Sequence, residues 1–188
     1  MTGPTTTAED LARELLARLP ERVAHTEGVA RKAEETAAIF EPDEALDLVA
    51  AAWLHDIGYA PWLVGIRMHA LDGGWFLQER HYPERVCQLV AHHSGARFEA
   101  RERGLLDRLE YSFPAPDPAL LDALTYADMT TSPRGLSVSF DERIAEIIRR
   151  YPPDDPVHRA ILAGRSDLAK SVENTLARLR RHPARGDQ

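Results

Sequence analysis

Two histidines and two aspartates, His25, His55, Asp56 and Asp128, lie in stretches whose apolar periodicity turns them toward the interior of the protein. Burying a carboxylate without a partner is costly, so these side chains need hydrogen bonds, cations or a metal ion. Any one of them alone is more commonly a hydrogen-bonded core residue, whereas the four together favour a metal site. Eight histidines beside a single cysteine indicate imidazole and carboxylate ligands, which excludes the common cysteine-rich structural zinc sites.

Three predicted helices position these four residues. A helix over residues 20–40 carries His25 on its apolar face. A second helix begins at Pro42 and ends at the histidine-aspartate pair. Its only polar residue between positions 45 and 54 is Asp47, so we expect it to run through the centre of the domain. Helical spacing over residues 120–128 places the last aspartate on an apolar stripe.

The remaining patterns also indicate helices. They are expected over residues 7–19, from His69 and from Pro83 onward, and over residues 99–110, 141–150, 156–163 and 167–181. No alternating strand pattern, internal repeat or linker is evident, so the predicted fold is all-α, a helical bundle with a buried metal centre. We expect a single domain over residues 1–188, with the core motifs at about 20–135 and C-terminal helices over 136–182.

The order of these motifs resembles the HD-domain superfamily of metal-dependent phosphohydrolases. The resemblance is carried by His25, then His55-Asp56 within Leu-His-Asp-Ile-Gly, then Asp128 within Tyr-Ala-Asp. Two further segments, Met-His-Ala around His69 and Ala-His-His-Ser-Gly over residues 91–95, are similar to the additional histidine motifs of binuclear members. Such members include the YqeK-like hydrolases of dinucleoside tetraphosphates and the HD-GYP phosphodiesterases.

The resemblance implies a set of ligands for two divalent metal ions. His25, His55, Asp56 and Asp128 would hold one ion, and His69 and His92 would complete the second, with Asp56 bridging the two. Helical spacing from Val86, Leu89 and Val90 points at His93 instead, but a histidine followed two places later by Ser-Gly favours His92. The catalytic candidates are Asp56 and His93. If His92 is the ligand, three roles remain open for His93: it lies beside the ligands, faces the substrate or is a hydrogen-bonded core residue.

The chemistry implied is phosphoester or phosphoanhydride hydrolysis of a small molecule, such as a nucleotide, by a metal-bound hydroxide. Imidazole and carboxylate suit iron, manganese, zinc or nickel, and the resemblance favours iron or manganese. Arg97, Lys32 and Thr131 are the candidate substrate-binding residues. Two alternatives remain open. One is a mixed-valent di-iron HD-domain oxygenase that cleaves a C–C or C–P bond, and the other is a non-catalytic nucleotide or metal sensor.

Composition restricts the partners. The chain of 188 residues has a net charge of −7, which repels nucleic-acid polymers and anionic membranes at long range. No apolar run approaches the roughly 20 residues of a membrane-spanning helix. The segment from Met1 to Glu9 lacks the features of a secretory signal, and one cysteine fits a reducing compartment, so we expect a cytoplasmic protein. The terminal helices are compatible with a homodimer.

Overall fold

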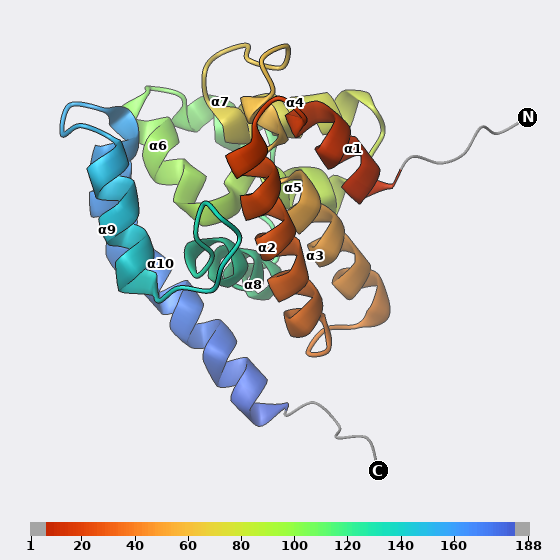
Figure 1. The fold of residues 1–188 in the computed structure, drawn as a ribbon. Helices are drawn as coiled ribbons and strands as arrows, with labels where there is room; N and C mark the ends of the chain where they lie inside the picture. The colour runs from red at the N-terminus through yellow and green to blue at the C-terminus, as the bar shows by residue number, and fades with distance from the viewer. Residues whose placement is uncertain (1–6, 183–188) are drawn as a thin grey trace, which may run out of the picture.

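The computed structural model describes residues 7–182, and in that range the chain forms α-helices and short 3-10 turns (Figure 1). The first half contains α1 (Ala8–Leu16), α2 (Pro20–Ala37), α3 (Pro42–Leu54), the 3-10 turn η1 (Ile57–Tyr59), α4 (His69–Glu79) and α5 (Glu84–His92). The second half contains the 3-10 turn η2 (His93–Gly95), α6 (Ala96–Glu102), α7 (Leu106–Ser112), α8 (Pro118–Met129), α9 (Phe140–Arg150) and α10 (Pro156–Arg181). The all-α prediction is confirmed, since the described part has no strand and only one isolated bridge, between Thr131 and Ser137.

Local signals explain where the main helices begin. Thr7 caps α1 and Ser139 caps α9, and in both cases an acidic residue three positions later completes a capping box. The carboxylates of Asp117 and Asp155 accept backbone N–H bonds at the starts of α8 and α10, which both have proline at the first position. These caps satisfy N–H groups that no helical carbonyl can reach.

Two expected boundaries are wrong. The single helix expected over residues 99–110 is two helices, α6 and α7, because Gly104 adopts the left-handed conformation with φ 68° between them. The two helices expected over 156–163 and 167–181 are one, α10, which continues through Gly164. A Cβ at Gly164 would lie 2.6 Å from Cδ2 of Phe98, so this glycine allows α6 to pack closely on α10.

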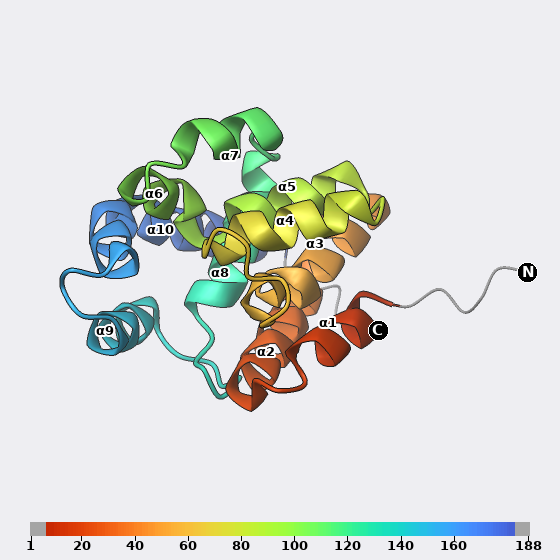
Figure 2. The same ribbon diagram turned by 90° about the horizontal axis from the view of Figure 1, so that it is seen from above.

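The core has two parts. The larger part lies among α1 to α8, where α2 packs on α3, α3 packs on α5 and α4 packs on α5 (Figures 1 and 2). The smaller part joins the end of α8 to α9 and α10. The second half of α3 is buried as predicted, but its first half is not central, because Leu46 is 70% exposed. The predicted central helix is therefore central only where it approaches His55.

None of the helices formed by residues 7–182 combines the length and the apolar character that a transmembrane segment needs.

Candidate metal centre

Six side chains gather in two adjacent groups inside the bundle. The first group is His25 of α2, His55 after α3 and Asp128 of α8. The second group is Asp56, His69 and His93. Within each group, one imidazole nitrogen or carboxylate oxygen of every residue lies within 4.8 Å of the others. The structure thus brings together five of the six predicted metal ligands and adds His93.

Asp56 lies between the two groups. Its Oδ1 is 3.6 Å from Nε2 of His69 and 4.0 Å from Nε2 of His93. Its Oδ2 is 3.5 Å from Nε2 of His55, which belongs to the first group. A carboxylate with one oxygen toward each group has the placement that a bridging ligand requires. The other carboxylate, Asp128, has its Oδ1 2.9 Å from Nε2 of His25.

A close backbone contact brings the second group together. α3 ends at Leu54, and the turn η1 follows the His55-Asp56 pair directly. A Cβ at Gly58 in this turn would lie 2.0 Å from the carbonyl oxygen of His69, so only glycine permits the turn to touch the first residue of α4. This contact places His69 beside Asp56. The glycine after the histidine-aspartate pair therefore serves the site and not only the end of the helix.

Three of the histidines are oriented in the same way by backbone carbonyls. Nδ1 of His55 donates to the carbonyl of Ala52 at 2.7 Å, and Nδ1 of His93 donates to that of Val90 at 2.6 Å. Nδ1 of His25 lies 3.1 Å from the carbonyl of Ser132. Because a carbonyl only accepts, the Nδ1 atom carries the proton, and in the neutral ring the lone pair lies on Nε2, which faces the cluster. Histidine ligands of metals commonly have this arrangement.

Burial and charge set the protonation states around Asp56. Desolvation and the neighbouring His93 hold the pKa of His69 well below its usual range, and desolvation and His55 lower the pKa of His93. Both rings are therefore neutral at pH 7, the form that binds metals. Burial alone would raise the pKa of Asp56, but the Arg22 guanidinium and the nearby His55 hold it well below its usual range. Asp56 is thus an ionised carboxylate.

An unpaired nitrogen in the cluster is a second, independent feature that fits a divalent metal. Nε2 of His55 belongs to the first group and lies 3.5 Å from Oδ2 of Asp56. It is buried and has no hydrogen-bond partner among the described residues. Leaving such an atom unpaired is costly, and a cation would satisfy its lone pair. The donor set of imidazole nitrogens and carboxylate oxygens is also the one that first-row transition metals accept.

The structure places His93, and not the predicted His92, in the second group. α5 ends at His92, and the backbone of His93 turns to φ −56° and ψ 150°. His92 therefore lies outside both groups, and its Nε2 is 2.9 Å from the carbonyl of Phe113. His93 is buried, and its Nε2 lies 3.1 Å from Nε2 of His69. The helical spacing that pointed at His93 was the better guide.

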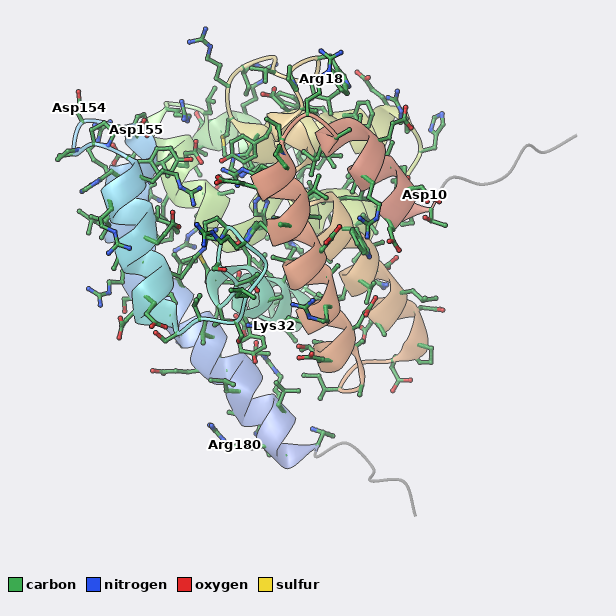
Figure 3. All side chains as sticks on the ribbon, viewed as in Figure 1. Asp10, Arg18, Lys32, Asp154, Asp155 and Arg180 are labelled. Atoms are coloured by element: carbon green, nitrogen blue, oxygen red, sulfur yellow. The ribbon has the colours of Figure 1, made fainter. Side chains whose placement is uncertain are left out.

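None of the three predicted substrate-binding residues faces the cluster. Lys32, labelled on α2 in Figure 3, is buried, and its ammonium donates to the carbonyl of Thr130 at 2.6 Å. The Thr131 hydroxyl, also buried, donates to the carbonyl of Ala127 at 2.7 Å. Arg97 pairs with Asp167 at 2.7 Å on the exposed surface. These groups support the fold or lie at the surface, so the structure does not bring the three predicted residues to the cluster.

A pocket opens over the two groups and has basic residues that the sequence analysis missed. Its walls include Arg22 of α2 and Arg143 and Arg150 of α9. Arg22 donates to Oδ2 of Asp56 at 2.6 Å, and its guanidinium lies 3.8 Å from the ring centre of Tyr59. The Tyr59 ring in turn stacks on His69 at 4.1 Å. The position of Arg22 three residues before His25, on the same helix face, was the signal available in the sequence.

Ser94 is a further residue that the motif alone did not assign. It adopts the left-handed region, with φ 46° and ψ 39°, which is uncommon for a residue with a side chain. In this conformation its hydroxyl donates to Oδ2 of Asp128. The strained turn after α5 therefore supports a predicted metal ligand on α8.

Comparisons with known proteins agree with this geometry. A model of the HD domain matches residues 22–132, a range that includes every residue of both groups. Neither the curated proteins nor the solved structures provide a match to the chain. HD domains bind divalent metals, and their superfamily comprises mainly hydrolases. The family match covers more than half of the chain. The chain therefore belongs to the HD domain family.

Proposed function

We propose that the protein is a metal-dependent phosphohydrolase that cleaves a phosphoester or phosphoanhydride of a small molecule, such as a nucleotide. The observation that supports this proposal best is the pocket that joins both ligand groups to Arg22, Arg143 and Arg150. Arginine binds phosphate oxygens through paired, charge-assisted hydrogen bonds. A buried site that combines carboxylates for cations with arginines for anions suits a phosphorylated substrate better than a neutral one.

Two divalent cations are the proposed cofactors, iron or manganese in preference to zinc or nickel. His25, His55 and Asp128 would hold one, His69 and His93 the other, and Asp56 would contribute to both. When bound, such cations lower the pKa of water and neutralise charge on phosphoryl oxygens. The neutral imidazoles and the ionised Asp56 are already in the protonation states that this role needs.

The protein's own groups supply the other requirements. Arg22, fixed between Asp56 and the Tyr59 ring, lies where it can bind a phosphate oxygen next to the second group. Glu99 also lines the pocket, and burial raises its pKa against the opposing effect of Arg103. A carboxyl group that retains its proton more readily can donate it to the leaving oxygen. Asp56 cannot take that role, because its pKa is held low.

The test is phosphate release by the protein loaded with manganese or iron. We expect the wild-type protein to hydrolyse a panel of nucleotides or p-nitrophenyl phosphate, and Asp56→Ala to lose at least about 100-fold in kcat/KM. Asp43→Ala removes an exposed carboxylate from the first turn of the same helix, α3, and should retain full activity. Turnover by Asp56→Ala at the wild-type rate would refute the proposal. Oxygen consumption by reduced, iron-loaded protein without phosphate release would favour the oxygenase alternative instead.

A further inference from the structure

The helix α9 carries a charged face that has no part in the two ligand groups. It begins after residue 132, where the HD domain match ends. Arg143, Glu146 and Arg150 are spaced by three and four residues, so they lie along one side of α9. One oxygen of Glu146 accepts a bond of 2.7 Å from Nη1 of Arg143, and the other accepts one of 2.9 Å from Nε of Arg150. One carboxylate thus holds both guanidinium groups in place.

Both arginines reach the pocket above the predicted metal ligands. They line it together with Arg22, which comes from α2. In Figures 1 and 2, α8 lies between α9 and α2, so the basic residues approach the pocket from two separate helices. Nη2 of Arg143 lies 3.5 Å from Oδ1 of Asp128, which is a long and weak contact. The α9 arginines therefore line the pocket beside the first ligand group, and this group does not use up their hydrogen-bond donors.

This face of α9 carries more positive than negative charge, and one of its buried donors is unpaired. Arg143 is only 5% exposed, and its Nε donor has no hydrogen-bond partner among the described residues. An unsatisfied buried donor on a charged group is costly. On α9 itself, Glu146 offers one negative charge to two guanidinium groups, and the further carboxylate near Arg143 is Asp128, at 3.5 Å. An anion with several acceptor oxygens would satisfy both the geometry and the charge.

We propose that Arg143 and Arg150, positioned by Glu146, bind phosphate oxygens of the substrate, so that a helix outside the HD match selects for phosphorylated compounds. This inference rests on the proposed function for its substrate, but phosphate binding itself is measurable without turnover. Arg143 and Arg150 are the binding residues. Glu146 acts through them as a positioning residue.

Inorganic phosphate is the probe, and its dissociation constant is measured by titration calorimetry with and without bound manganese. Arg150→Gln should weaken phosphate binding by about 10-fold or more, the effect expected for loss of a charge-assisted hydrogen bond. Arg149→Gln is the matched control, because Arg149 is the exposed neighbour on α9 and does not line the pocket. It removes the same charge and should change the affinity by less than about 2-fold.

Glu146→Gln separates positioning from simple repulsion. If Glu146 only repelled anions, its neutralisation would tighten phosphate binding. We expect weaker binding and a higher KM with kcat retained, because the two guanidinium groups lose their common anchor. Unchanged or tighter phosphate binding would remove Glu146 from the inference.

The two proposals fail in different ways. If the wild-type protein binds phosphate through Arg150 but releases none from any phosphoester, the anion site is supported and the hydrolase function fails. If it hydrolyses phosphoesters while Arg150→Gln matches wild type and Arg149→Gln in both phosphate affinity and KM, the anion site is refuted and the hydrolase function stands. Absence of phosphate binding by the wild-type protein would also refute the anion site.

Discussion

The guanidinium of Arg22 donates a hydrogen bond of 2.6 Å to Oδ2 of Asp56, and only 4% of that aspartate side chain is exposed. The carboxylate thus has an internal cation on one side and the imidazoles of the second ligand group on the other. Arg22 therefore has two effects on the site. It keeps Asp56 ionised, and it shares the negative charge that a bound metal would use.

Arg22→Gln should destabilise the metal-free protein by roughly 2–3 kcal/mol, because it leaves a buried carboxylate without its cation while the partly exposed arginine moderates the effect. Added manganese should then raise the unfolding temperature of this variant more than that of wild type. Arg85→Gln is the control, since Arg85 makes an ion pair of the same length with Asp47 in a more exposed setting. For Arg85→Gln we expect the free energy of unfolding to fall by less than about 1 kcal/mol. Equal losses for the two variants, measured by thermal unfolding in chelator, would contradict the prediction.

The adjacent histidines allow a second comparison. His93→Asn should reduce the amount of metal bound after reconstitution, because it removes a nitrogen from the second group. His92→Asn should bind as much metal as wild type, since His92 contacts the carbonyl of Phe113 instead. Metal content per protein, determined by elemental analysis after gel filtration, distinguishes the two. The reverse pattern would restore the ligand role that the sequence motif gave to His92.

The sequence predicted the parts of the site that depend on helical periodicity. His25, His55 and Asp128 were placed inside by their apolar neighbours, and these are the residues of the first group. The arginines of the pocket wall were not predicted, because their positions depend on how helices meet. Lys32 shares a helix with His25, yet it points toward the segment after α8. Nothing in the local pattern of α9 shows that Arg143 approaches Asp128 across the pocket.

Lys32 should matter for stability and not for substrate binding. Its ammonium donates to the carbonyl and hydroxyl of Thr130 and to Ser137, so Lys32→Met removes three hydrogen bonds made by a buried charged group. We expect a loss of about 2–3 kcal/mol in unfolding free energy, measured in urea, with metal content and KM unchanged. The exposed Lys170→Met provides the control and should alter the unfolding free energy by less than about 0.5 kcal/mol. A raised KM with unaltered stability would return Lys32 to the substrate site.

Cys87 gives a prediction about pH. The thiol is 3% exposed, and burial raises its pKa to about 11. In the unfolded chain the pKa is about 8.5, so between these values the unfolded state loses a proton that the folded state keeps. The stability contributed by this group is therefore present below about pH 8.5 and declines as the pH rises toward 11.

Wild type and Cys87→Ala isolate this effect, because all other titrating groups are common to both proteins. The free energy of unfolding of wild type, relative to that of the variant, should decrease between pH 8 and pH 10.5, and it should be constant from pH 6 to pH 8. Urea titrations at each pH measure the difference. At pH 8 the native thiol should also react with iodoacetamide at least about 100-fold more slowly than the thiol in urea, because thiolate is the reactive form. A difference in stability that does not vary up to pH 10.5 would show that the folded thiol is not shifted.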